Sequence, residues 1–405
     1  MKIRINPSVA CGAVKAPPSK SIAHRALICG ALSGGSVINN LAPSKDIIAT
    51  IDCLSALGVD LTVNGNSVEI GGLDPFNVKE NAILNCNESG STLRFLIPLC
   101  LVSGKKITFK GAKRLFERPL SIYESICQEQ GILFEKGETE LTVCGKLKSG
   151  NYRIRGDVSS QFISGMLFTL PLLDGVSIIE VIGELESKPY IDLTLQTLAE
   201  FGIKITHVGS RFIILGNQRY VSNELTVEGD CSNAANLYAF NLIGGNVTVE
   251  GINENSLQGD KVFYDIFKAL ETGKREFDLS NCLDLAPILF AVAAVKGGAT
   301  FTGTARLKIK ESDRSEAMAQ ELKKFGVDVE IGDNLVKIGS STIKAPTETL
   351  CGHNDHRIVM ALSVLCTVVG GVIEGAEAVE KSYPEFFNAL RHLNIGFEFY
   401  EDGQL

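Results

Sequence analysis

Residues 157–203, DVSSQFISGMLFTLPLLDGVSIIEVIGELESKPYIDLTLQTLAEFGI, contain the complete pattern from which the fold can be predicted. It opens on a small polar cluster, continues as an apolar segment that predicts a helix, and turns at Gly175 into a β-branched strand. A second, amphipathic helix follows, and the ending Phe201-Gly202-Ile203 leads into another strand. Because one such unit cannot bury its apolar faces alone, we expect neighbouring copies.

The same order of features recurs along the chain. The copies begin near Ser19, Glu88, Asp157, Asp230, Asp284 and Asn354. Their spacing is regular except that the fourth copy is shortened. Six copies in 405 residues predict two domains of three copies each, with the seam near residues 227–230. The alternation of helix and strand predicts an α/β or α+β fold.

Composition limits the kinds of partner. Hydrophobic residues make up 45% and charged residues 21%, which is typical of a folded globular chain and excludes a disordered one. The 39 Lys and Arg against 47 Asp and Glu give a net charge of −8, which argues against nucleic acid as a partner. Any anion must therefore be held by a local cluster of positive charge.

Location follows from the cysteines and from the apolar runs. The eleven cysteines form no Cys-x-x-Cys pair and resemble small buried hydrophobic residues of a reducing compartment. Residues 1–14 lack the apolar core of a secretion signal. The longest uncharged run, 358–373, is interrupted by two glycines and predicts a buried helix followed by a strand. We expect a cytoplasmic protein with no membrane partner.

Positive charges stand at the wrong ends of helices. A helix N-terminus carries partial positive charge and favours Asp or Glu, not Lys or Arg. The cations near predicted helix starts are Lys20, Arg25, Arg94, Arg314 and Arg357. Arg118 and Lys188 directly precede prolines that predict first helical positions, and Lys381 stands three residues before Pro384. One such case would mean little, but the cations recur at equivalent places in the copies.

A bound anion would turn this conflict into an advantage, because amides, dipole and guanidinium would all point at it. Repeated units present equivalent ends on one face, so we expect an anion site between the two domains. The hydroxyls and amide that could add hydrogen bonds are Ser159, Ser160, Gln161, Ser187 and Tyr190. A plain helix cap explains any one of these serines equally well.

Two carboxylates lie close to the cations in sequence. Glu311 stands between Lys310 and Arg314, and Asp284 heads the apolar stretch 285–295. One could act as an acid and the other as a base if their surroundings differ. Taken singly, Glu311 fits a surface ion pair and Asp284 fits a helix cap. His353 and His356 lack partners at metal-ligand spacing and suggest a structural role.

Eight motifs in order give the chain a resemblance to a known family. They are Ser19-Lys20-Ser21-x-x-x-Arg25, Ser89-Gly90-Ser91-Thr92-Leu93-Arg94, Glu117-Arg118-Pro119, Ser159-Ser160-Gln161-Phe162, Ser187-Lys188-Pro189-Tyr190, Lys310-Glu311-Ser312-Asp313-Arg314, Asn354-Asp355-His356-Arg357 and Lys381-Ser382-Tyr383-Pro384. The chain resembles the enolpyruvylshikimate-phosphate synthases, which are enolpyruvyl transferases. The resemblance implies a two-domain inside-out barrel of six folding units, with one domain of residues 1–14 plus 228–405, the other of residues 15–227, and the active site in the cleft between them.

The same resemblance implies a reaction and its binding residues. The enolpyruvyl group of phosphoenolpyruvate would pass to the 5-hydroxyl of shikimate 3-phosphate, releasing phosphate, on the route to chorismate and aromatic amino acids. Shikimate 3-phosphate would be held by Lys20, Ser21, Arg25, Ser159, Ser160, Gln161, Ser187, Asp284 and Lys310. Phosphoenolpyruvate would be held by Lys20, Gly90, Arg118, Gln161, Arg314, Arg357 and Lys381, with Arg94 in support.

The roles expected in catalysis follow from this resemblance. Glu311 would protonate the methylene carbon and later remove a methyl proton, while Asp284, with Lys20 nearby, would take the hydroxyl proton. The reaction would pass through a tetrahedral ketal without metal or organic cofactor. We expect a monomer whose only partners are the two substrates.

The chain departs from the family pattern in a few places. Pro18 replaces a common Gly, Glu88-Ser89 replaces a common Asn-Ala, and Arg306 stands where Asn often contacts substrate, so Arg306 is left out of the site. The short fourth copy is a further departure.

Two alternatives remain. The sister enzymes acting on UDP-N-acetylglucosamine typically have Lys-Asn at Lys20-Ser21, and a cysteine in the loop that spans residues 111–116 here. A non-catalytic binder of phosphorylated ligands or RNA ends is opposed by the net charge and by the two carboxylates.

Overall fold

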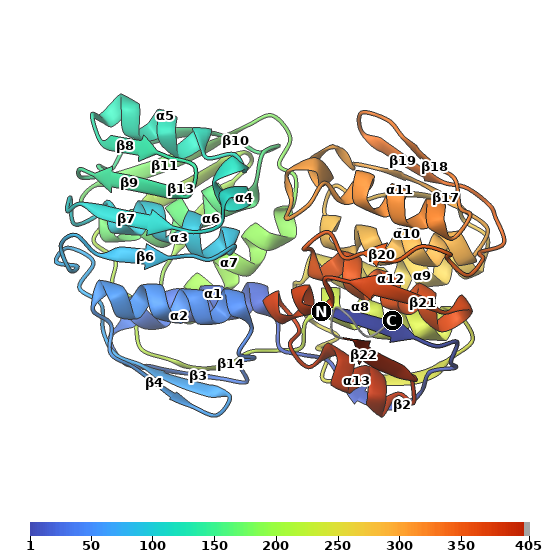
Figure 1. Cartoon of the computed structure of the whole chain (residues 1–405). Coiled ribbons are helices and arrows are strands. Elements are labelled where there is room, and N and C mark those ends of the chain that lie inside the picture. The colour runs from blue at the N-terminus through green and yellow to red at the C-terminus, as the bar shows by residue number, and fades with distance from the viewer. Residues whose placement is uncertain (401–405) are drawn as a thin grey trace. The chain divides into compact units, whose positions relative to one another are not determined.

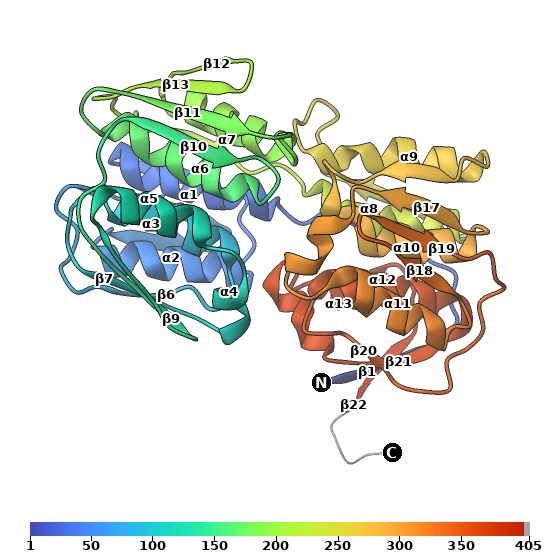
Figure 2. The same cartoon turned by 90° about the horizontal axis from the view of Figure 1, so that it is seen from above.

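The computed structural model describes residues 1–400, which form two compact units (Figures 1 and 2). One unit is Pro18–Glu228, and the other combines Met1–Pro17 with the chain from Gly229 onward. Each unit repeats one pattern of helices and strands, and we describe the two in turn.

The unit Pro18–Glu228 contains three four-stranded sheets. In spatial order they are β14 (Glu224–Thr226), β3 (Ser36–Asn39), β5 (Ser67–Ile70) and β4 (Leu61–Asn64); β6 (Ile83–Asn85), β7 (Ile107–Lys110), β9 (Glu140–Cys144) and β8 (Leu133–Lys136); and β10 (Asn151–Arg155), β11 (Val176–Ile182), β13 (Arg211–Leu215) and β12 (Ile205–Val208). In each sheet the first two strands are parallel, and the other two form an antiparallel hairpin. The parallel pairs are joined through helices, as parallel strands require.

The helices of this unit form an inner and an outer set. They are α1 (Lys20–Ser33), α2 (Lys45–Leu57), α3 (Gly90–Cys100), α4 (Lys113–Glu117), α5 (Ser121–Gln130), α6 (Ser160–Thr169), η1 (Leu170–Leu172) and α7 (Lys188–Glu200). The first helix of each copy, α1, α3 or α6, is buried along almost its whole length. The outer helices α2, α5 and α7 are amphipathic and bury one face, so the core lies around α1, α3 and α6.

The other unit follows the same plan with one exception. Its sheets are β16 (Glu276–Asp278), β17 (Ala299–Thr302), β19 (Leu335–Ile338) and β18 (Val329–Ile331); β20 (Leu350–Cys351), β21 (Gly371–Glu374), β1 (Lys2–Ile5) and β22 (Phe397–Tyr400); and the pair β15 (Asn246–Glu250) and β2 (Cys11–Lys15). Strand β1 lies antiparallel between β21 and β22, with Ile3 opposite Ile373 and Phe399. The shortened fourth copy has only β15, which pairs in parallel with β2.

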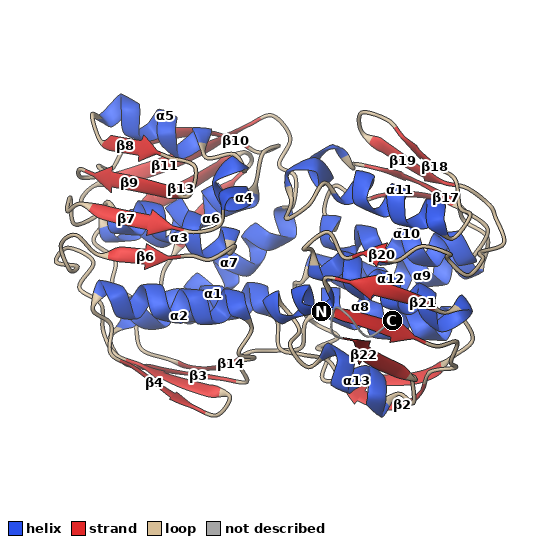
Figure 3. Cartoon of the chain, in the orientation of Figure 1, coloured by secondary structure: helices blue, strands red, loops and turns tan. Residues whose placement is uncertain are grey.

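The helices of the second unit again form two sets. They are α8 (Cys231–Leu242), η2 (Gly259–Val262), α9 (Phe263–Glu271), η3 (Leu283–Leu285), α10 (Ala286–Val295), η4 (Ala305–Ile309), α11 (Arg314–Lys324), α12 (His356–Val369), η5 (Ala376–Lys381) and α13 (Phe386–His392). Helices α8, α10 and α12 are the buried ones. The strands of each unit lie toward the outside of its buried helices (Figure 3).

The mixed α/β class and the repeated units predicted from the sequence are confirmed. The barrel is not: within residues 1–400 every sheet is open, with two edge strands. The uncharged run 358–373 forms most of α12 followed by β21, as predicted. No helix in the described range is long and apolar enough to cross a membrane.

Two predicted helix starts were wrong. Pro189 does lie in the first turn of α7, but Pro119 precedes α5, which begins at Ser121, and Pro384 precedes α13, which begins at Phe386. Arg118 is extended, with φ −68° and ψ 148°, because a residue before proline is pushed out of the helical region.

Candidate active site

In the unit Pro18–Glu228, the start of α1 carries two of the predicted cations. Lys20 Nζ donates to Asp46 Oδ2 on α2 at 2.8 Å. Arg25 donates from Nε to Thr194 Oγ1 at 2.9 Å and from its two other nitrogens to the carbonyls of Ser21 and Tyr190 at 2.6 and 2.8 Å. Burial lowers the pKa of Arg25 to about 10, so the guanidinium stays charged. Asp46 was not predicted, because an Asp in a first helical turn is ordinary.

Two guanidinium groups meet at the start of α3. A Cβ added to Gly90 would lie 2.8 Å from Nη1 of both Arg94 and Arg118. Arg94 also donates from Nη1 to Gln161 Oε1 and from Nη2 to the Pro119 carbonyl, each at 3.0 Å. Burial, and then the charge of Arg118, hold the pKa of Arg94 well below its usual range. Two like charges at one helix N-terminus suit an anion as their shared partner.

Of the predicted polar residues of α6 and α7, Gln161 bonds the start of α3. Gln161 Nε2 donates to Ser91 Oγ at 2.9 Å, which links α6 to the start of α3. Ser159 caps α6 by accepting from the Gln161 amide at 3.3 Å. Ser187 is buried and has a positive φ of 55°, a conformation that non-glycine residues rarely adopt. Such outliers cluster at functional sites.

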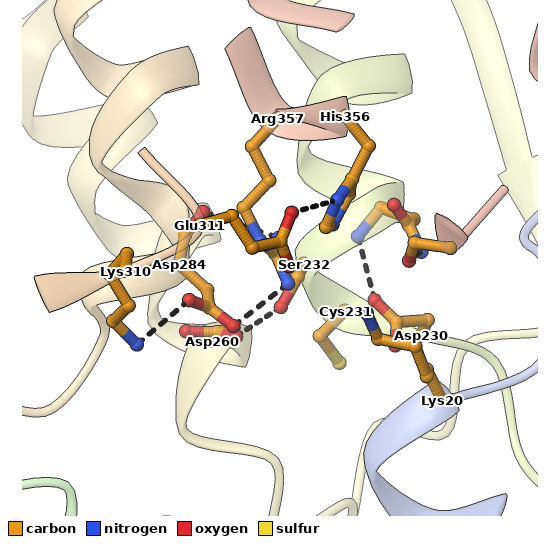
Figure 4. A network of polar contacts seen from close by, with 12 residues as sticks. Lys20, Asp230, Cys231, Ser232, Asp260, Asp284, Lys310, Glu311, His356 and Arg357 are labelled. Atoms are coloured by element: carbon orange, nitrogen blue, oxygen red, sulfur yellow. Dashed lines mark hydrogen bonds and ion pairs between the residues drawn. The ribbon is translucent and has the colours of Figure 1, made fainter. Parts of the chain in front are cut away.

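In the other unit, Asp284 lies at the centre of a charged cluster (Figure 4). Its Oδ1 accepts from Arg314 Nη1 at 2.8 Å and from Lys310 Nζ at 3.2 Å, and its Oδ2 accepts from Arg357 Nη2 at 2.8 Å. Three predicted cations from three segments therefore share one predicted carboxylate. They come from the starts of α11 and α12 and from the residue after η4.

The cluster shifts the pKa of its members. Burial alone would raise the pKa of Asp284, but Arg357, Lys310 and Arg314 outweigh it and hold that pKa well below its usual range. Burial lowers the pKa of Lys310 to about 8, although Asp284 opposes the shift. Asp284 is therefore ionised at neutral pH.

Glu311, the second predicted carboxylate, is bonded to a different residue. Its Oε2 lies 2.9 Å from Nδ1 of His356, which is 1% exposed (Figure 4). The sequence had suggested only a structural role for His356. A bond to a buried imidazole orients the carboxylate and gives Glu311 surroundings unlike those of Asp284.

Asp355 is a further residue that the sequence reading did not assign. It is fully buried, accepts from Arg314 Nε at 2.9 Å and Ser312 Oγ at 3.1 Å, and caps α12 through the Arg357 amide at 3.0 Å. Ligand atoms of Glu311, Asp355 and His356 lie within 4.8 Å of one another, a spacing that could hold a metal ion. Because hydrogen bonds already engage the oxygens of Asp355 and Glu311, we assign the cluster to hydrogen bonding.

Two other cations, Arg306 and Lys381, belong to the same unit as Asp284. Lys381, at the end of η5, donates to the Asn354 carbonyl at 2.5 Å. Arg306 donates to the Ser280 carbonyl at 2.7 Å. Lys381 therefore contacts the turn that leads to Arg357.

Each unit thus combines repeated α/β folding units with buried cations at helix starts, and one unit adds two carboxylates in different surroundings. This combination defines a class of protein that binds small molecules carrying several acidic groups and can move protons on them.

Comparisons with known proteins identify the family. The family model of EPSP synthase (3-phosphoshikimate 1-carboxyvinyltransferase) matches residues 6–390. A 3-phosphoshikimate 1-carboxyvinyltransferase of Clostridium kluyveri is 45% identical over 416 residues, covering 96% of this chain and 97% of its own, and one of Clostridium novyi is 42% identical over 419 residues, covering 95% of each. The chain belongs to the EPSP synthase family, as the resemblance of its motifs had indicated.

Solved structures agree on the fold. An EPSP synthase from Acinetobacter baumannii superposes with a TM-score of 0.79 at 22% identity, covering 99% of this chain and 100% of its own. At this identity the likeness concerns the fold alone. The superposition covers both units of this chain, with their repeated helices and strands.

Proposed function

We propose that this protein transfers the enolpyruvyl group of phosphoenolpyruvate to the 5-hydroxyl of shikimate 3-phosphate and releases phosphate. Family membership supports this reaction. The observation that carries it is the pairing of Asp284, held ionised by three cations, with Glu311, held by His356. A reaction that needs both a base and a proton donor requires two such distinct groups.

The cations bind the acidic groups of the two substrates. We assign shikimate 3-phosphate to Lys20, Ser21, Arg25, Ser159, Ser160, Gln161, Ser187, Asp284 and Lys310. We assign phosphoenolpyruvate to Lys20, Gly90, Arg118, Gln161, Arg314, Arg357 and Lys381, with Arg94 in support. In this proposal both predicted domains act on one pair of substrates. Those domains are residues 1–14 plus 228–405, and residues 15–227. Arg is suited to this task because its planar fork matches carboxylate and phosphate.

The proton steps divide between the two carboxylates. Glu311 delivers a proton to the methylene carbon of phosphoenolpyruvate as the substrate hydroxyl oxygen attacks the adjacent carbon, and Asp284, assisted by Lys20, takes the hydroxyl proton. Glu311 then removes a proton from the new methyl group of the tetrahedral ketal, the double bond re-forms, and phosphate leaves. Substrate anions that draw Arg314 and Arg357 away from Asp284 raise its basicity when it is needed.

We further propose that the protein works as a monomer in the reducing cytoplasm. All eleven cysteines lie in the described part of the chain and are free thiols, in keeping with a reducing location. The proposed steps use only side-chain acids and bases.

Phosphate release tests the proposal. Purified protein should release phosphate when shikimate 3-phosphate and phosphoenolpyruvate are present together and from neither substrate alone. Replacing shikimate 3-phosphate with UDP-N-acetylglucosamine should abolish release. Release from the sugar nucleotide, or from phosphoenolpyruvate alone, would contradict the assignment.

A further inference from the structure

The turn that leads into α12 is held in a strained backbone conformation. His353 and Asn354 have φ of 48° and 50°, so two consecutive residues with side chains lie in the left-handed region. A residue with a side chain is strained in this region, so the conformation persists only where the surroundings hold it. The turn delivers Asp355 and Arg357, and its Asn354 carbonyl contacts Lys381. Its shape therefore affects where two cations of the proposed site, Arg357 and Lys381, lie.

One buried carboxylate on α11 holds the start and the middle of this turn. The Glu321 side chain is 1% exposed. Its Oε2 accepts from the Cys351 amide at 2.9 Å and from Lys324 Nζ at 2.8 Å, while its Oε1 lies 2.8 Å from His353 Nε2. Burial opposes ionisation, but the bonds from His353, Lys324 and Cys351 outweigh it and lower the pKa of Glu321.

The same helix contacts the turn at a second point. Arg314 lies seven residues before Glu321 on α11, and seven residues make about two helical turns, so both side chains project from one face. Arg314 bonds Asp355, the last residue of the turn, and Glu321 bonds Cys351 and His353 at its start and middle. Helix α11 therefore fixes the whole segment from 351 to 355.

We propose that Glu321, together with His353, is a positioning residue for phosphoenolpyruvate binding. It touches no substrate, and it acts by fixing the turn that places Arg357 and the carbonyl bonded to Lys381. This inference rests on the proposed function, which assigns both cations to phosphoenolpyruvate. Arg25, which we assign to shikimate 3-phosphate alone, belongs to the other unit.

Two variants test it. Glu321→Gln keeps the shape of the side chain and removes its charge. His353→Asn removes the imidazole but keeps a residue type that tolerates the left-handed conformation. Each should raise KM for phosphoenolpyruvate about tenfold, because small displacements of binding groups are costly. KM for shikimate 3-phosphate should change much less, because most of the residues assigned to it lie in the other unit. The matched control is Glu316→Gln, since Glu316 is an exposed residue of the same helix bonded to Gln320.

Hydrogen exchange at the Cys351 amide gives a readout that does not depend on activity. In Glu321→Gln, the loss of charge weakens the bond that the Cys351 amide donates, and in His353→Asn the carboxylate loses the His353 bond at its other oxygen. Exchange at the Cys351 amide should therefore be faster in both variants and unchanged in the Glu316→Gln control. Faster exchange with an unchanged KM would overturn the positioning role, and so would variants that behave like the control in both measurements. If Glu321→Gln does not fold, His353→Asn decides the matter alone. Absence of phosphate release from the unaltered protein would instead overturn the proposed function.

Discussion

Gly90→Ala should weaken phosphoenolpyruvate binding selectively. The added Cβ would lie 2.8 Å from Nη1 of Arg94, 2.8 Å from Nη1 of Arg118 and 2.9 Å from Nη2 of Arg118, whereas ordinary contact begins at 3.4 Å. The two guanidinium groups must therefore move away by roughly 0.6 Å, and a 1 Å misplacement can cost about a hundredfold. We expect KM for phosphoenolpyruvate to rise about tenfold.

The assay is steady-state phosphate release with each substrate varied in turn. KM for shikimate 3-phosphate should change less, because the added Cβ would meet Arg94 and Arg118 first and not Arg25. Gly137→Ala is the matched control, since its added Cβ would meet atoms only at 3.5 Å or beyond and its φ is not positive. An unchanged KM for phosphoenolpyruvate, or an equal rise of KM for both substrates, would show that Gly90 does not place the two guanidinium groups for phosphoenolpyruvate.

Three further outcomes follow from the two clusters and from a buried histidine. Glu311→Gln should lower kcat by about 10²–10⁴-fold with little change in either KM, because it removes the proton donor; a near-normal kcat would exclude that role. Asp284→Asn should lower the free energy of unfolding by about 3 kcal/mol in urea titrations, because buried cations lose their carboxylate; unchanged stability would contradict the cluster. Burial, Lys20 and Arg25 hold the pKa of His24 well below 6.5, so the folded state keeps it neutral while the unfolded chain binds a proton below that pH. The free energy of unfolding should therefore fall as pH drops from 6.5, and His24→Gln, but not the exposed His207→Gln, should flatten this dependence; an equal slope in both variants would contradict it.

Local signals predicted the helix starts well. Ser89, Ser159 and Asp355 each cap a buried helix, as the small polar residues before apolar runs had indicated. Capping and hydrophobic periodicity act within a few residues, so a single sequence carries them. The wrong starts at Pro119 and Pro384 show the limit of one such signal, because proline also occupies the extended residues before a helix.

Contacts distant in sequence could not be predicted in the same way. Strand β1 pairs with β21 and β22, which lie at the other end of the chain, and no local pattern specifies that register. The pairing of β15, in the shortened fourth copy, with β2 could not be predicted for the same reason.

The sequence predicted which residue types form the site, but not how their side chains contact one another. Misplaced cations indicated an anion site, but only coordinates show that Arg94 and Arg118 meet at Gly90. The bond from His356 to Glu311 was missed because histidine was tested only for metal-ligand spacing. A buried histidine next to a motif arginine was the signal that could have found it.

Hydrogen exchange can show whether cations of both units bind the same two substrates. The measurement uses the Glu311→Gln variant, which should bind both substrates without turning them over. Adding shikimate 3-phosphate and phosphoenolpyruvate together should slow exchange in both units. The segments expected to be protected are residues 19–25 and 89–94 of one unit and residues 310–314 and 355–357 of the other. Protection confined to the segments of a single unit would show that the two units do not share the substrates.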